Sequence, residues 1–419
     1  MSSAMRSAIA HGVVIYLGTA VSSLIMLVVK VLIDRELGTD VLGEYELGLS
    51  LVLLISVFAL FGFHTSIARG VAKEGEAAYP LVRKAYFWVL CVCGVATGIS
   101  TPLINWIYGD TVVPYFALYL SPFLFAVCLL NLNMAFFQGR QRMSRVSGTM
   151  ALDSVARGCA VALALILALQ AHSLLLAMGL FALAFEILVT MRIHAGLRYP
   201  GPDAMPFGDF AHLSFYIFLI AASGAISVRI SAFVVAYSLS MEELGFFAIA
   251  NVFTLPLSLL GRTIETVLLP RASSGSEFDL GRFAALAFAL ALGAIPLYYI
   301  FSGTAVGILF GEGNDQAVVV LRILSVGYSA ILVYSVFSAY IFGRAPRRFL
   351  AKLVVITFAQ SLLIVPALNS YLVGSMGLPG AGWATNIALI IQTSLWVGAG
   401  LLLSRRNGEP HARAGRPLI

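Results

Sequence analysis

Long apolar segments are the feature that most constrains how this chain can fold. Hydrophobic residues make up 60% of its 419 residues and charged residues only 11%, against roughly 25% charged residues in an average soluble domain. A helix needs about 20 mostly apolar residues to cross a bilayer. Twelve such runs are present, at 11–33, 45–67, 85–108, 114–137, 148–170, 172–191, 212–237, 245–269, 284–303, 315–342, 349–372 and 381–403. The sequence therefore predicts an all-α integral membrane protein with twelve transmembrane helices.

A repeat with an offset of 202 to 204 residues divides these runs into two sets. Gly43 and Tyr45 in LGEY correspond to Gly245 and Phe247 in LGFF. Other landmarks keep the same order, and they pair Arg69 with Arg271, Gly109 with Gly311, and Gly139 and Arg140 with Gly343 and Arg344. Duplicated sets of membrane helices are typical of transporters that bind their cargo between two halves.

The repeat predicts two six-helix lobes, an N-terminal lobe at 1–191 and a C-terminal lobe at 212–403. A polar linker rich in proline and glycine, 192–211, separates them, and 404–419 forms a tail. Because each lobe holds an even number of spans, both copies enter the membrane in the same orientation. Their pseudo-two-fold axis should then lie along the membrane normal, with a cleft between the lobes.

Lysine and arginine collect on one side of the predicted membrane. They follow the even-numbered runs and fill the tail, whereas among the loops of opposite parity only Arg35 appears. Positively charged loops stay in the cytoplasm, so both termini are predicted to be cytoplasmic and the protein to lie in the cytoplasmic membrane. The net charge of +6 follows from this topology, and no nucleic-acid partner is needed to explain it.

Five basic residues lie inside apolar runs: Lys30, Arg157, Arg229, Arg262 and Arg322. A charged side chain at the centre of a spanning helix costs about 2.5 to 3.5 kcal/mol on insertion scales, so such residues usually face a bundle interior, a wet cavity or a partner. Two of the arginines have an acid one turn away on the same helix, which allows a local pair.

Those local pairs are Asp153 with Arg157, four residues apart, and Arg262 with Glu265, three apart. Arg229 and Arg322 have no acid within four residues, and the nearest acid to Lys30 is Asp34 at the outer end of its run. Lys30 and Arg322 are near enough to a helix end to extend towards the headgroups instead. An arginine that stays charged and presents a planar fork of donors matches phosphate oxygens. We therefore expect these cations to line a cavity for an anionic ligand, with phosphate as the simplest one.

The histidine and cysteine residues in or near the predicted spans give weaker indications of function. His64, near the end of the second run, is a candidate for proton coupling, although a lone histidine in a helix is more often only hydrogen bonded. All four cysteines fall inside predicted spans, where they are expected to pack. Cys91 and Cys93 point to different faces of one helix, so no metal site and no cofactor are predicted.

Two stretches carry a family resemblance. VLIDRELGTDVLGEYELGLSLVLLISVFALFGFHTSIAR in the first set and GILFGEGNDQAVVVLRILSVGYSAILVYSVFSAYIFGR in the second resemble the polysaccharide flippases of the Wzx type. These belong to the multidrug, oligosaccharidyl-lipid and polysaccharide exporter superfamily, which has the MATE-like fold. The resemblance implies two lobes that rock between inward-open and outward-open states. It also implies a cargo, a lipid-linked oligosaccharide on polyprenyl pyrophosphate, which moves to the outer leaflet.

The resemblance also implies roles for single residues. Helices one, two, seven and eight would line the central cleft, which makes Lys30, Arg229 and Arg262 the first candidates for binding the cargo, followed by Arg157 and Arg322. Arg69 and Arg271 would sit at equivalent cytoplasmic helix ends, where they either engage the pyrophosphate as a gate or anchor the helices. The implied partners are the lipid-linked oligosaccharide, membrane lipids and glycan-assembly proteins.

Two other function classes compete with this interpretation. A cation-coupled multidrug exporter of the same superfamily would need acids in its first helix, but the first run holds Lys30 and no carboxylate until Asp34. A membrane glycan polymerase or ligase would need catalytic groups in a sizeable external loop. The external loops are short, and no nucleophile, base and orienting group converge on one segment, so the sequence favours a transporter that is not an enzyme.

Overall fold

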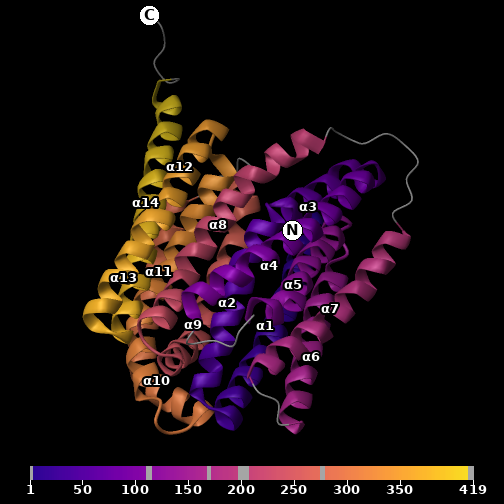
Figure 1. Cartoon of the computed structure of the whole chain (residues 1–419). Helices are drawn as coiled ribbons and strands as arrows, with labels where there is room; N and C mark the ends of the chain where they lie inside the picture. The colour runs from indigo at the N-terminus through magenta and orange to yellow at the C-terminus, as the bar shows by residue number, and fades with distance from the viewer. Residues whose placement is uncertain (1–2, 110–115, 168–170, 197–206, 274–278, 414–419) are drawn as a thin grey trace, which may run out of the picture. The chain divides into compact units, whose positions relative to one another are not determined.

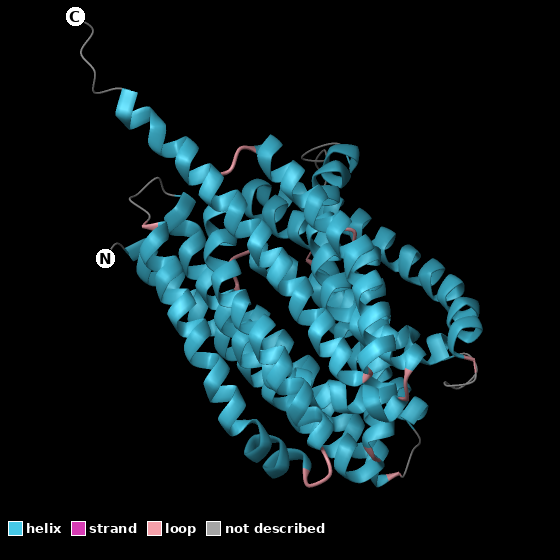
Figure 2. Cartoon of the chain, turned by 90° about the vertical axis from the view of Figure 1, so that its left-hand side faces the viewer, coloured by secondary structure: helices cyan, strands magenta, loops and turns pink. Residues whose placement is uncertain are grey.

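The protein consists largely of long helices. The computed structural model describes residues 3–109, 116–167, 171–196, 207–273 and 279–413, and within these ranges the chain is almost entirely helical, without a strand (Figure 2). Backbone groups in lipid have no water to bond to, so a helix, which satisfies them internally, is the structure that long apolar segments adopt. Twelve of the described helical segments are long and apolar enough to cross a membrane. The predicted all-α membrane class with twelve spans is confirmed.

The described chain divides into two compact units, Met1–Ala248 and Ile249–Ile419. The helices of the first unit, labelled in Figure 1, are α1 (Ser3–Leu37), α2 (Thr39–Leu60), α3 (Phe63–Glu74), α4 (Tyr79–Tyr108), α5 (Phe116–Gly139), α6 (Met143–Ile166), α7 (Ala171–Ala195) and α8 (Phe207–Ser238). The division falls inside α9 (Met241–Ser273). The repeat predicts two lobes at 1–191 and 212–403, which divide the chain at another place. That division stays a prediction.

Helix α5 forms the centre of the first unit. It packs against α2, α3, α4, α6 and α7, and most of its side chains are buried, with Phe123, Cys128 and Leu132 fully so. Helix α2 packs in addition against α1 and α8. Side chains from α1, α2 and α8 can therefore meet within this unit.

The second unit is built around α11. Its helices are α10 (Leu280–Phe310), α11 (Asp315–Arg344), α12 (Arg347–Ala359), α13 (Val365–Met376) and α14 (Leu378–Arg413). Helix α11 packs against α10 and α14, and α13 packs against α14. A π-helical turn at Gln360–Ile364 joins α12 to α13 just before Pro366, whose ring removes a backbone donor. Helix α10 runs unbroken to Phe310, so the ninth apolar run extends past Gly303.

The second predicted run, 45–67, is wrong at its C-terminal end. Helix α2 stops at Leu60, and the left-handed residues Phe61 and Gly62 turn the chain into α3. A side chain at Gly62 would place its Cβ 2.3 Å from the carbonyl oxygen of Ser214 on α8. The break therefore depends on both the left-handed backbone, which favours glycine, and the close approach of a helix far away in the sequence.

Candidate functional site

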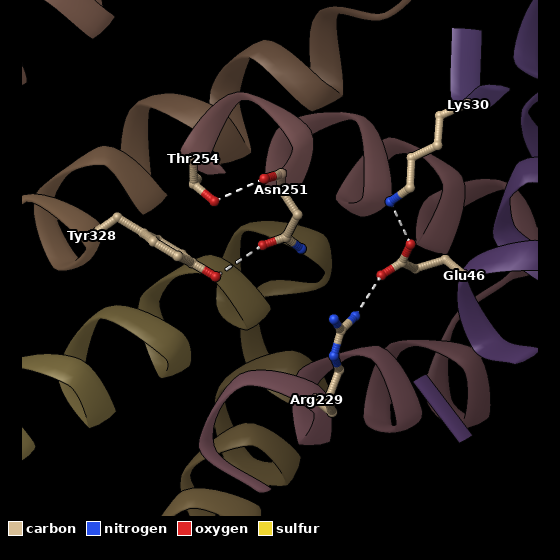
Figure 3. Close-up of polar contacts among 6 residues, drawn as sticks. All are labelled: Lys30, Glu46, Arg229, Asn251, Thr254 and Tyr328. Carbon is tan, nitrogen blue, oxygen red and sulfur yellow. Dashed lines mark hydrogen bonds and ion pairs between the residues drawn. The ribbon is translucent and has the colours of Figure 1, made fainter. Parts of the chain in front are cut away.

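Two of the predicted cations share one carboxylate in the first unit. The Lys30 Nζ lies 2.6 Å from Oε2 of Glu46, and the Arg229 Nη1 lies 3.1 Å from Oε1 of the same residue (Figure 3). Glu46 lies on α2. Lys30 approaches it from α1, and Arg229 approaches it from α8. The side chain of Glu46 is only 4% exposed, against 12% for Lys30 and 25% for Arg229.

The charges in this cluster do not cancel. Two cations and one carboxylate leave one formal positive charge inside membrane-spanning helices. Each of the two carboxylate oxygens accepts from one cation, so both oxygens of Glu46 take part in the cluster. Lys30 and Arg229 are thus held close together by an internal anion, and they carry an excess charge that a second anion would neutralise.

Close helix packing holds Glu46 in place. Gly43 lies one turn before Glu46 on α2, and a Cβ there would lie 1.8 Å from the carbonyl oxygen of Met241. A Cβ at Gly245 would in turn lie 2.0 Å from the carbonyl oxygen of Thr39. The two glycines of the first repeat landmark therefore allow the starts of α2 and α9 to touch backbone to backbone.

Arg157 is paired on its own helix, as the spacing predicts. Its Nη2 lies 2.6 Å from the Asp153 carboxylate, and the guanidinium lies 4.7 Å from the centre of the Phe123 ring. Both charged residues are buried on α6. One cation and one anion make a neutral pair, so this arginine has less need of a further anion than Lys30 or Arg229.

The remaining two cations lie in the second unit. Arg322 donates from Nε to the Ser302 hydroxyl at 3.1 Å and lies 4.8 Å from the centre of the Tyr299 ring. Arg262 is exposed on α9. Its expected pair does not form: among the described residues, no Glu265 oxygen lies within 4.0 Å of Arg262, and the Glu265 Oε1 accepts from Ser338 at 2.8 Å instead.

Of the gate and proton-coupling candidates, Arg69 and His64 lie on α3, after the break from α2. Arg69 is exposed on α3, whereas Arg271 belongs to α9 with a side chain outside the described part of the structure. His64 is half-buried on α3, and burial lowers the pKa of its imidazole. Its Nδ1 is buried and has no hydrogen-bond partner among the described groups. Proton coupling through His64 stays a prediction.

Sequence reasoning missed Glu46, the residue that organises the cluster. Glu46 stands at the edge of the second apolar run, next to Tyr45 of the repeat. An acidic residue at that position is easily taken for part of a loop. The signal that could have found it was chemical: Lys30 and Arg229 needed an anion, and a carboxylate within a spanning helix needs a cation.

A second polar network was also unforeseen. Glu186, fully buried on α7, accepts from the Asn133 amide at 2.6 Å, and Tyr86 donates to the Asn133 carbonyl at 2.8 Å. In the second unit, Tyr328 donates to the Asn251 side chain at 3.3 Å (Figure 3). Among the described residues, no group of three or more His, Cys, Asp or Glu is placed to hold a metal ion.

Comparison with known proteins assigns the family. The sequence profile described as "Polysaccharide biosynthesis protein" matches residues 9–276, more than half of the chain. The chain belongs to the polysaccharide biosynthesis protein family. The chain is also similar to the "Putative O-antigen transporter" of Shigella flexneri. The two sequences are 23% identical over 411 residues, which cover 90% of this chain and 94% of that one.

Solved structures show that this polysaccharide biosynthesis protein has the MATE-like fold. It is similar to the lipid II flippase MurJ in an inward closed conformation, with a TM-score of 0.72, 15% identity, and 94% of this chain and 90% of that chain covered. It is also similar to an inward-facing multidrug resistance MATE family transporter of the MOP superfamily, with a TM-score of 0.70, 15% identity, and 92% and 96% covered. The resemblance to Wzx-type flippases is confirmed, and a transporter or flippase is supported.

Proposed function

We propose that this protein is a flippase that moves a lipid-linked oligosaccharide, carried on polyprenyl pyrophosphate, from the cytoplasmic to the outer leaflet by alternating access. Lys30 and Arg229 bind the pyrophosphate, and the protein lies in the cytoplasmic membrane with both termini in the cytoplasm. The observation that carries the proposal is the shared carboxylate: two cations within spanning helices hold one internal anion between them.

A pyrophosphate satisfies this arrangement better than a neutral or cationic cargo. Its oxygens carry more negative charge than one carboxylate, and they can accept from the ammonium of Lys30 and the planar fork of Arg229 at the same time. Neutralising the excess positive charge lets the headgroup leave water at membrane depth, where an unpaired charge is costly.

Glu46 acts in this scheme as the counter-ion of the unloaded protein. It keeps Lys30 and Arg229 close together and prevents their mutual repulsion. When pyrophosphate enters, it competes with Glu46 for Lys30 and Arg229, because each of these cations already donates to one Glu46 oxygen. Exchange of one anion for another leaves few donors unsatisfied at any stage, which keeps the barrier to loading low.

The direct test is flipping by the purified protein in liposomes. A polyprenyl diphosphate bearing a fluorescent sugar is placed in both leaflets, and an impermeant reductant reports how fast the inner pool becomes accessible. We expect Lys30→Gln and Arg229→Gln each to slow flipping about tenfold or more, because each removes a charged hydrogen bond worth about 1.5 to 3 kcal/mol. Wild-type rates in both variants would contradict the proposal.

Two controls separate binding from folding. Arg282→Gln removes a surface arginine whose side chain is 89% exposed and pairs with Asp279, and exposed pairs contribute little, so it should flip as the wild type does. The triple variant K30Q/E46Q/R229Q replaces the whole cluster by amides of similar shape and leaves no bare charge. It should remain folded, as thermal unfolding would show, and yet fail to flip the probe.

The same liposomes test the multidrug alternative, which buried carboxylates such as Glu46 and Glu186 favour. A cation-coupled exporter would accumulate a cationic dye against a proton or sodium gradient. The positive excess at Lys30 and Arg229 should repel that dye. We therefore expect no gradient-driven dye transport, and dye transport without lipid flipping would replace the proposed function by the alternative.

A further inference from the structure

Helix α4 carries a second basic surface, away from the cluster at Glu46. Arg83, Lys84, Phe87 and Trp88 are all exposed. The spacing places Phe87 one turn after Arg83, and Trp88 one turn after Lys84, on the same face of the helix. The residues that precede and separate these two exposed pairs are buried against the rest of the first unit, namely Leu81, Val82, Ala85 and Tyr86. One face of α4 thus holds the helix in the bundle, and the other is exposed.

This exposed face contains an open cavity of about 390 Å³, lined by Pro80, Arg83, Lys84, Phe87 and Trp88. Small-molecule sites typically measure about 300 to 1,000 Å³, so the cavity has room for a headgroup. Phe87 is 68% exposed and Trp88 51% exposed. Large aromatic side chains this exposed on a spanning helix contact lipid, and they are enriched at the level of the headgroups.

The Arg83 charge calls for an anion. Among the described residues, no carboxylate oxygen lies within 4.0 Å of the Arg83 guanidinium, and Lys84 follows it on the same exposed face. Arg83 and Lys84 lie near the start of the span at Gly75–Tyr108. The aromatic pair is four residues further along, about 6 Å deeper at 1.5 Å per residue. A phosphate at the level of the basic pair would therefore place its acyl chain along Phe87 and Trp88.

We propose that this face of α4 binds an anionic phospholipid of the cytoplasmic leaflet, with the phosphate on Arg83 and Lys84 and a chain on Phe87 and Trp88. A free phosphate ion would use the basic pair and leave the aromatic wall of the cavity without a function. Basic residues beside a membrane gain about 1 kcal/mol each from anionic lipid. The site is separate from the proposed cargo site and does not depend on flipping.

Native mass spectrometry of the purified protein tests this assignment. The protein is incubated with phosphatidylglycerol or phosphatidylcholine, and the retained lipid is counted for wild type and R83Q/K84Q. We expect the wild type to retain phosphatidylglycerol preferentially, and the variant to lose about fivefold in affinity for each charge removed. The control R142Q/R145Q removes two other exposed arginines and should keep the preference.

A second measurement follows the lipid chain. Lipids with brominated chains should quench Trp88, so the quenched part of the tryptophan emission should fall in Trp88→Phe. Equal retention of the two lipids by the wild type, or an unchanged preference in R83Q/K84Q, would overturn the proposal. Displacement of the lipid by millimolar free pyrophosphate would do so as well, because the site would then recognise a soluble phosphate.

Discussion

The cluster at Glu46 and the pair at Asp153 both join a carboxylate to basic side chains, but they differ in the number of cations for each carboxylate. Glu46 holds two cations from two other helices, Lys30 and Arg229, whereas Asp153 holds one cation from its own helix, Arg157. The pair is neutral and lies within one turn of α6. The cluster joins α1, α2 and α8 and keeps a positive charge in excess.

The difference shows that a count of buried cations does not identify a binding site. All five basic residues inside the spans were equal candidates by hydropathy. Their partners separate them: a neutral pair has a structural role, and an arrangement with excess charge has capacity for a ligand. The comparison can be tested by removing charges from each region and asking whether stability or binding changes.

The largest effect is expected in the neutral pair. Arg157→Gln leaves the Asp153 carboxylate buried without its cation, which typically costs about 3 to 5 kcal/mol. Thermal or denaturant unfolding in detergent should therefore show strong destabilisation. The double variant D153N/R157Q removes both charges and should recover most of the stability while flipping at the wild-type rate. Weak flipping by a stable double variant would show that Arg157 belongs to the cargo site after all.

A smaller effect should follow from the glycine contact beside the cluster. Gly43→Ala places a Cβ against the carbonyl oxygen of Met241, and overpacking of this kind costs about 1 to 3 kcal/mol. Because α2 must move, the Glu46 contacts should also loosen, so the melting temperature should fall while the affinity for the polyprenyl diphosphate rises, since Glu46 then competes less for Lys30 and Arg229. Gly75→Ala serves as a control for backbone strain alone. At the exposed Gly75, a Cβ would meet nothing within 4 Å, but φ is 59°. If Gly43→Ala changes neither quantity, helix spacing does not hold the cluster.

The smallest effect is a pH response that belongs to neither charged region. Burial lowers the pKa of His64 below its value near 6.5 in the unfolded chain, so the unfolded state binds more protons between the two values. The stability from neutral His64 is present above about pH 6.5 and is lost as the pH falls through the lower, folded pKa. Melting temperatures at pH 5.5 and 7.5 should thus differ less in His64→Gln than in the wild type. An equal difference in both would assign the response to another group.

The fold was predictable to a large extent because the bilayer sets the length of each span. Twelve apolar runs became twelve described spans, since a helix satisfies the backbone of each span internally in lipid. The ends of helices were less predictable. Helix α2 stops at Leu60 because α8 approaches Gly62, and a contact between residues about 150 positions apart leaves no local mark on hydropathy.

The site was predictable only in part. Lys30 and Arg229 stood out because a charge in an apolar run needs a reason, and the pairing of Asp153 with Arg157 followed from helical spacing. Glu46 did not stand out, because its importance comes from the meeting of three helices. The pairing of Arg262 with Glu265 failed for a related reason, since Ser338 on α11 accommodates the carboxylate.

Binding of a polyprenyl diphosphate to Glu46→Gln tests the central claim most directly. The claim is that Glu46 competes with the cargo's pyrophosphate for Lys30 and Arg229. Removing the competing carboxylate should therefore tighten binding about tenfold, with the uncharged polyprenyl alcohol as a control that binds wild type and variant alike. If Glu46→Gln binds the diphosphate no better than the wild type, or more weakly, Lys30 and Arg229 are partners of Glu46 alone and not the cargo site.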